Sequence, residues 1–352
     1  MDLGADSLDH PRAPDSSLGA APPGRLRRPQ GVREVTCALW QLSRPQGAFW
    51  LSWIVLIGYG FTLWDWGMGP RGLTGLVVIL GSWWLLNAGS LWLNAVLDDD
   101  QGEVLFQSRP VALPRGTAFA GYLALAAAVL VSAFSRWPGV LCAAGAALLA
   151  VLYSHPRTCW KGHALGGPFV NLVGYGMLTP LAGYAQTGLP ATPRGAVTLV
   201  LLAAWILGAY FVAQAFQQRE DAERGYSTLV VTRGAAGVIR VARWLMGFSM
   251  VGVVAGIVLG YYPRLLLLGV PLLWLTDRYI GRWRAAAVEH DAERWGRAMA
   301  MGLHRRMMFS GAVLFVLAYC DYQADYQSDR PAAGWATARG RPPSPQRFQN
   351  SD

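Results

Sequence analysis

The sequence predicts an all-α, polytopic membrane protein, a bundle of about nine transmembrane helices whose acidic loops face the cytoplasm. The 352 residues are 53% hydrophobic and only 14% charged, which is too apolar for an ordinary soluble domain. Apolar stretches near the ~20 residues that a helix needs to cross a bilayer recur along the chain. These stretches show no alternation of polar and apolar residues, which excludes a membrane β-barrel and leaves helices.

Nine apolar stretches define the predicted spans, and those at 138–154 and 264–280 are short. They cover residues 48–64, 73–97, 118–134, 138–154, 166–185, 197–216, 242–262, 264–280 and 307–322. Residues 1–45 form a basic arm rich in Pro and Gly, without the compact apolar segment of a cleaved signal peptide, and we expect it to be disordered. Residues 46–323 then form one transmembrane domain, and residues 324–352 form a disordered tail.

Positive charge sets the predicted orientation. The N-terminal arm and the even-numbered loops contain 22 of the 30 Lys and Arg residues, which places this side in the cytoplasm and the protein in the inner (plasma) membrane of the cell. The net charge of +9 fits a surface attracted to anionic lipid or phosphate.

The basic residues are not interleaved with aromatics on one soluble unit, so nucleic acid is excluded as a partner. The four Cys show no metal or redox spacing, and no feature indicates an oligomeric state.

Two acidic segments follow the second and sixth predicted spans. Four spans separate them, so both lie on the cytoplasmic side. Residues four apart share one face of a helix, and carboxylate or amide oxygens suit Mg²⁺ together with a substrate diphosphate. The candidate metal ligands are Asp98, Asp99, Asp100, Glu103, Gln217 and Asp221. The alternative is that these acids are solvated and pair with nearby arginines such as Arg219 and Arg224.

Lys161 is the only lysine among 30 basic residues. A compact ammonium there, with Arg109 from the first acidic loop, would neutralise phosphate oxygens on a leaving group. Lys161 lies in the loop that starts at Tyr153 and also contains Arg157 and two histidines, which are candidates for accepting a proton. The alternatives are that Lys161 and Arg157 only follow the positive-inside rule and that the histidines are solvated.

These segments resemble the motifs of the UbiA-type intramembrane prenyltransferases over roughly residues 45–323. The first motif is matched by Asn94, Asp98, Arg109-Pro110 and Pro114-Arg115-Gly116. The loop after the fourth span is matched by Tyr153, Ser154, Pro156 and Lys161, and the second motif by Asp221, Gly225, Thr228 and Leu229. Ala95, Gly102 and Gln217 replace acids that are usual in the family, which leaves the number of metal ions open.

The resemblance implies a function. A prenyl chain would move from an allylic diphosphate to a lipophilic acceptor through an allylic carbocation. Asp98, Asp99 and Asp221 would bind Mg²⁺, with Asp98, Asp221 and Lys161 central to catalysis. The diphosphate would be held by Asn94, Arg109 and Lys161, with Tyr153 and Arg157 as further candidates.

Two other functions fit the same motifs. One is a membrane terpene cyclase, in which the cation is captured within its own chain. The other is an inactive homologue that binds or transports lipid. Aromatic residues are expected either to line the cavity and stabilise the cation or to face lipid as an interfacial belt. They are Trp83, Trp84 and Trp92 in the second span, and Tyr175 and Tyr184 in the fifth.

Overall fold

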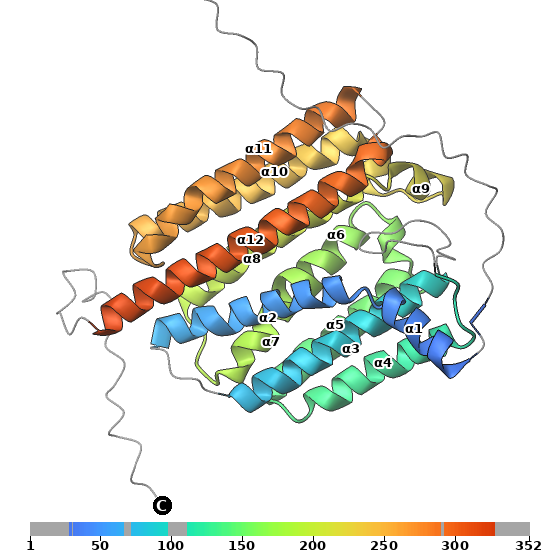
Figure 1. The fold of residues 1–352 in the computed structure, drawn as a ribbon, viewed down its shortest axis with the longest axis horizontal. Coiled ribbons are helices and arrows are strands. Elements are labelled where there is room, and N and C mark those ends of the chain that lie inside the picture. Colours follow the sequence, from blue (N-terminus) through green and yellow to red (C-terminus); the bar gives the residue numbers. More distant parts are fainter. Residues whose placement is uncertain (1–27, 30, 67–71, 98–110, 290–291, 328–352) are drawn as a thin grey trace, which may run out of the picture.

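The structure, a computed structural model, describes residues 28–29, 31–66, 72–97, 111–289 and 292–327 (Figure 1). Within these ranges the regular structure is helical, apart from one bridge between His163 and Ser227. The long helices are α2 (Pro45–Trp66), α3 (Leu73–Leu97), α4 (Thr117–Ser132), α5 (Trp137–Ser154), α8 (Pro193–Gln214), α10 (Leu229–Val258), α11 (Val270–Glu289) and α12 (Ala292–Gln327). The short ones are α1 (Val32–Leu42), η1 (Trp160–Gly162), α6 (Gly166–Val170), η2 (Asn171–Leu178), α7 (Thr179–Gln186), α9 (Gln218–Glu223) and η3 (Arg264–Gly269).

Every predicted span lies mostly in helix, so the expected all-helical class is confirmed. Of the described helices, α3, α5, α8 and α10 are long and apolar enough to cross a membrane. Helix α10 starts well before the predicted span at 242–262, and Gly234 interrupts it with a left-handed φ of 70°. Helix α12 likewise begins before the predicted span at 307–322, and it packs against α11.

The fifth predicted span forms one continuous helical run through α6, η2 and α7. Residues Asn171–Leu178 have π-helical geometry directly before Pro180, which has no backbone N–H to donate. The Thr179 hydroxyl donates to the Gly174 carbonyl at 2.8 Å and accepts a hydrogen bond from the Trp83 indole at 3.0 Å. The helix before Pro180 is therefore widened by π-helical turns and is fixed to α3 through Trp83.

The bundle has two large packed cores that meet at α8, besides a smaller apolar cluster around Tyr262. One core joins α2, α3, α4, α5 and α7, and the other joins α8, α10, α11 and α12. Helices α2 and α7 approach through glycine: a Cβ on Gly58 would overlap the Pro180 carbonyl, and one on Gly183 would overlap the Val55 carbonyl. Small residues thus allow close backbone contact between these helices.

Large apolar side chains cover the outside of the bundle. Phe134 is 82% exposed, Trp244 76% and Phe309 64%. Water would not favour so many exposed apolar groups, whereas lipid solvates them. The outer surface therefore fits a bilayer.

The segment before the first span differs from the expected disordered arm. Residues 32–42 form α1, which packs on α3 at one end of the bundle (Figure 1). The Trp92 indole donates to the Leu39 carbonyl at 2.8 Å, and the Asn87 amide donates to the Ser43 carbonyl at 2.7 Å. For residues 32–42 the expectation of disorder was wrong. Contacts with α3, which is distant in sequence, compensate for the polar composition of the arm.

Candidate active site

Lys161 lies in a buried position beside the end of α3. Its side chain is 8% exposed, and its ammonium donates to the Asn94 Oδ1 atom at 3.2 Å. The Ser154 hydroxyl, at the end of α5, donates to the same oxygen at 3.2 Å. Asn94 thus joins α3, α5 and η1, and its carbonyl oxygen holds the lysine in place.

Burial lowers the pKa of Lys161 to about 8. The charge of Arg224 contributes to this lowering of the pKa, whereas the carboxylates of Asp221 and Glu220 oppose it. The ammonium therefore pays a desolvation cost that a bound anion would offset.

Asp221 is the buried acid of the second motif. It lies in α9, is 8% exposed, and accepts a hydrogen bond from the Thr228 hydroxyl at 2.7 Å. Burial raises the pKa of Asp221, although Thr228, Arg224 and Lys161 each lower it. A desolvated carboxylate of this kind fits a cation, and Gln217, one turn earlier, adds an amide oxygen of the type that Mg²⁺ accepts.

The neighbouring acids pair with arginine. Glu220 lies 2.8 Å from Arg224, and the exposed Glu223 lies 2.8 Å from Arg219. The arginine-pairing alternative therefore describes Glu220 and Glu223 but not Asp221.

Backbone contacts hold the loop that contains Lys161 against the second motif. The Ser227 N–H donates to the Gly162 carbonyl at 2.8 Å, beside the bridge between His163 and Ser227. The Tyr226 ring packs against Gly162, where a Cβ would come within 2.8 Å of it. Lys161 and Asp221 are therefore positioned by one joined layer, at the end of the bundle where α9 lies (Figure 1).

A cavity of about 370 Å³ opens beside this layer, between the two packed cores. Three residues of the predicted motifs line it: Asn94, Tyr153 and Gln217. Its apolar wall includes Trp50, Trp83, Tyr175, Ile206 and Met307. The site therefore combines a polar end with an apolar chamber.

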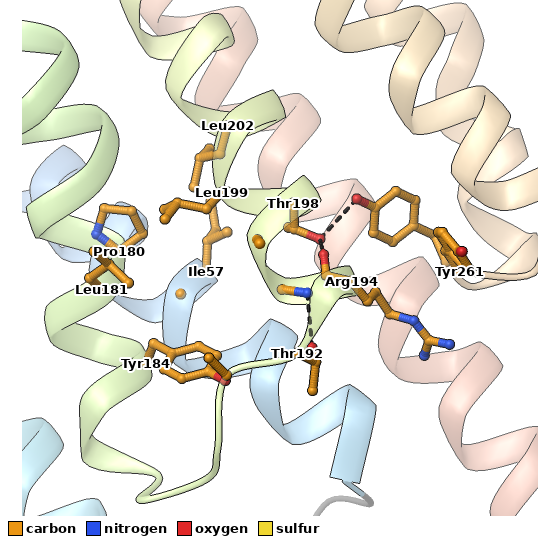
Figure 2. A pocket seen from close by; sticks show the side chains of 15 residues that line it. Ile57, Pro180, Leu181, Tyr184, Thr192, Arg194, Thr198, Leu199, Leu202 and Tyr261 are labelled. Atoms are coloured by element: carbon orange, nitrogen blue, oxygen red, sulfur yellow. Dashed lines mark hydrogen bonds between the residues drawn. The ribbon is translucent and has the colours of Figure 1, made fainter. Parts of the chain in front are cut away.

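Trp83 and Tyr175 are the expected aromatic residues that line this cavity. Trp84 is instead 37% exposed and stacks on Trp40, and Trp92 binds α1. Tyr184 lines a different pocket, of about 160 Å³, next to the connection between α7 and α8, at the opposite end of the bundle from α9 (Figures 1 and 2). That pocket is mostly apolar and has Arg194 as its charged residue, stacked 5.4 Å from the Tyr261 ring centre.

The other predicted site residues either lie outside the described residues or do not line the cavity. Asp98, Asp99, Asp100, Glu103 and Arg109 lie outside the described residues, beyond the end of α3 at Leu97. Within the described ranges no three His, Cys, Asp or Glu side chains cluster for a metal. Arg157 is exposed and does not line the cavity, and the His155 imidazole accepts a hydrogen bond from the Arg157 N–H at 3.2 Å.

The cavity residues that were missed at the level of sequence include four with charged or amide side chains. They are Arg44, which has a left-handed φ of 46° between α1 and α2, and Asn87, Gln214 and His304. Asn87 and Gln214 carried a usable signal, because a polar side chain inside an apolar helix marks an internal site. Arg44 and His304 did not, because each looks like an ordinary charged flank of a span.

A profile of the UbiA prenyltransferase family matches residues 47–304. The chain therefore belongs to the UbiA prenyltransferase family. The match spans both motif loops and all the helices from α2 to the start of α12, and it confirms the resemblance of the motifs. Together with its apolar helices, this membership makes the chain an integral membrane protein.

Solved structures of UbiA homologues share this fold. One from Archaeoglobus fulgidus, bound to DMAPP and Mg²⁺, has a TM-score of 0.61 at 15% identity and covers 81% of this chain and 99% of its own. A digeranylgeranylglyceryl phosphate synthase has a TM-score of 0.57 at 16% identity, with the same coverage. An apo homologue from Aeropyrum pernix K1 has a TM-score of 0.54 at 13% identity, covering 80% and 98%. Curated protein sequences give no significant match.

Proposed function

We propose that this protein is a Mg²⁺-dependent prenyltransferase that moves an isoprenoid chain from an allylic diphosphate to a lipophilic acceptor. One observation carries the proposal: the buried Lys161 and Asp221 lie in one layer beside an apolar cavity. Family membership supports it, as do the related structures from Archaeoglobus fulgidus bound to DMAPP or to GPP with Mg²⁺.

In this proposal Lys161 and Arg44 bind diphosphate oxygens, and Asn94 positions Lys161. The resemblance assigns the same role to Arg109, which lies outside the described residues, and Tyr153 and Arg157 are further candidates. Asp221 and Gln217 would hold Mg²⁺ together with acids of the first motif, Asp98, Asp99, Asp100 and Glu103. The metal would act as a Lewis acid on the diphosphate and so make it a better leaving group.

The substrate then ionises. The C1–O bond breaks, its electron pair leaves with the diphosphate, and an allylic cation remains in the cavity. Apolar side chains exclude water there, and the faces of Trp83 and Tyr175 stabilise positive charge. The acceptor forms a new bond to C1 and loses a proton.

The membrane arrangement is part of the proposal. The nine spans, with the motif loops and N-terminus in the cytoplasm and the protein in the inner membrane, follow from the charge distribution of the loops. The diphosphate group of the substrate would then bind from the cytoplasmic side, and the lipophilic acceptor would enter from the bilayer.

The test is release of diphosphate from geranyl, farnesyl and geranylgeranyl diphosphates by the purified protein in lipid, with and without Mg²⁺. Release that needs the metal supports an ionising enzyme. Prenylated acceptors identify a transferase, whereas cyclic hydrocarbons formed without any acceptor identify a cyclase. Intact diphosphate in every condition, with a panel of acceptors present, would leave the binding or transport function instead.

A further inference from the structure

Tyr210 and Gln214 form a polar pair in the wall of the central cavity. They lie one turn apart at the end of α8, and both line the cavity. The Gln214 Nε2 atom donates to the Tyr210 hydroxyl at 2.8 Å. Gln214 is 3% exposed, so its amide has almost no access to bulk water.

This pair has hydrogen-bonding capacity left over. The Gln214 Oε1 atom is buried and has no hydrogen-bond partner within the part of the chain that the structure describes. The Tyr210 hydroxyl accepts from Gln214, which leaves its own proton to donate elsewhere. A buried carbonyl without a partner is costly, so the site favours a ligand that supplies one.

The remaining acceptor on Gln214 and the remaining donor on Tyr210 together fit a hydroxyl group on a ligand. A hydroxyl both donates and accepts, so it satisfies the Gln214 carbonyl and the Tyr210 proton together. The Gln214 nitrogen faces Tyr210, so the amide oxygen is the atom that needs a donor. An ether or a hydrocarbon at this place supplies no donor.

The pair also lies at the reacting end of the cavity. The Gln214 backbone carbonyl accepts from the Gln217 N–H at 2.9 Å, directly before the motif that contains Asp221. A group bound by Gln214 is therefore close to the proposed position of the diphosphate rather than along the apolar wall.

We propose that Tyr210 and Gln214 bind a neutral hydroxyl group of the prenyl acceptor, so that the natural acceptor is a hydroxylated lipophile such as a phenol. This inference rests on the proposed function, because it assigns the acceptor's place in that reaction. It makes Tyr210 and Gln214 determinants of acceptor specificity.

The test is equilibrium binding of two probes to the full chain in nanodiscs, with binding to empty discs subtracted. The probes are 1-naphthol and its methyl ether, which match in ring and size but differ in the hydrogen-bond donor. We expect the wild type to bind 1-naphthol about tenfold more tightly than the ether. Gln214→Met and Tyr210→Phe reduce this ratio toward one, whereas Gln41→Leu, at an exposed position on α1, keeps it.

The outcomes separate this inference from the proposed function, because binding needs no turnover. A wild type that binds both probes equally, or binds neither, overturns the inference, as do variants that retain the full preference. Two variants at different positions guard against misfolding of one of them. If the preference is present but no prenyl diphosphate is ionised, the hydroxyl site stands and the proposed function fails.

Discussion

At the scale of single residues, the site depends on two opposite charges that are both largely removed from water. Lys161 and Asp221 are each 8% exposed, and each raises the stability of the charged form of the other. Desolvation nevertheless dominates both, since the pKa of Lys161 is lowered and that of Asp221 is raised. Such a pair suits a site that binds an anion and a cation together, because each ligand offsets one desolvation cost.

Replacing Asp221 tests the metal side of this pair. Asp221→Asn keeps the shape of the side chain but removes the charge, so we expect Mg²⁺-dependent release of diphosphate to fall at least about 100-fold. The matched control is Glu223→Gln, which lies in the same helix and loses only an exposed ion pair with Arg219. Equal rates for the two variants would remove Asp221 from the proposed metal site.

The lowered pKa of Lys161 predicts that binding of a diphosphate depends on pH. Below pH about 8 its amine is charged, and above this value it is mostly neutral in the free protein. Binding of a diphosphate requires the charged form, so the apparent Kd for geranyl diphosphate should rise about tenfold for each pH unit above this pKa. Binding at high pH should also take up one proton.

The measurement is titration calorimetry with geranyl diphosphate in buffers of different ionisation enthalpy. Lys161→Arg is the control, because arginine keeps its charge over the whole range and takes up no proton. Titration of the diphosphate itself affects both proteins equally and cancels in the comparison. Identical proton uptake by the two proteins contradicts the role assigned to Lys161.

At the scale of helices and loops, close backbone contacts position the site. Glycines bring α2 against α7, and the Ser227–Gly162 hydrogen bond joins the second motif to the loop that contains Lys161. These contacts are far apart in sequence, so each element depends on another for its position. A helix contact made without side chains leaves little room for substitution.

Gly58 and Gly60 make a matched pair for testing the α2–α7 contact. A Cβ on Gly58 would overlap the Pro180 carbonyl, whereas one on Gly60 meets nothing within 4 Å. We expect Gly58→Ala to lower the free energy of unfolding by about 1–3 kcal/mol, because backbone must move apart. Gly60→Ala should have no such cost. Unfolding of each variant in mixed micelles by a denaturing detergent measures both, and equal losses would contradict the packing.

At the scale of the whole molecule, the two ends of the bundle differ in chemistry. The end with α9 contains the motif loops, and the opposite end contains the α7–α8 connection with the smaller, mostly apolar pocket (Figures 1 and 2). Charge asymmetry between the loops predicts that the first end faces the cytoplasm.

Labelling of single cysteines tests this orientation. The four native cysteines are first replaced by serine. The Arg157→Cys and Arg194→Cys variants are then treated with an impermeant maleimide in right-side-out vesicles. We expect the position at Arg194 to react directly and the position at Arg157 only after the vesicles are opened. Reaction of both from one side would contradict the predicted topology.

Much of this protein could be read from its residues alone. A helix needs a long apolar stretch to cross lipid, so these stretches predicted where helices form. The stretch at 73–97 matches α3 at both ends, whereas α10 and α12 begin earlier than predicted. The family was predicted from short motifs that the match over residues 47–304 confirms. The roles of the individual motif residues remain predictions, and the first acidic motif lies outside the described residues.

Only the tertiary structure decided which polar groups share the cavity. Composition marks Asn87 and Gln214 as unusual, but packing of distant helices places them with Arg44 and His304 around one space. The same packing separated Tyr184 from Tyr175 and gave helix α1 its partners on α3. The physical reason is that the bilayer requires an apolar composition within each span, which can be read locally from the sequence. A site instead depends on contacts between side chains that are distant in the sequence.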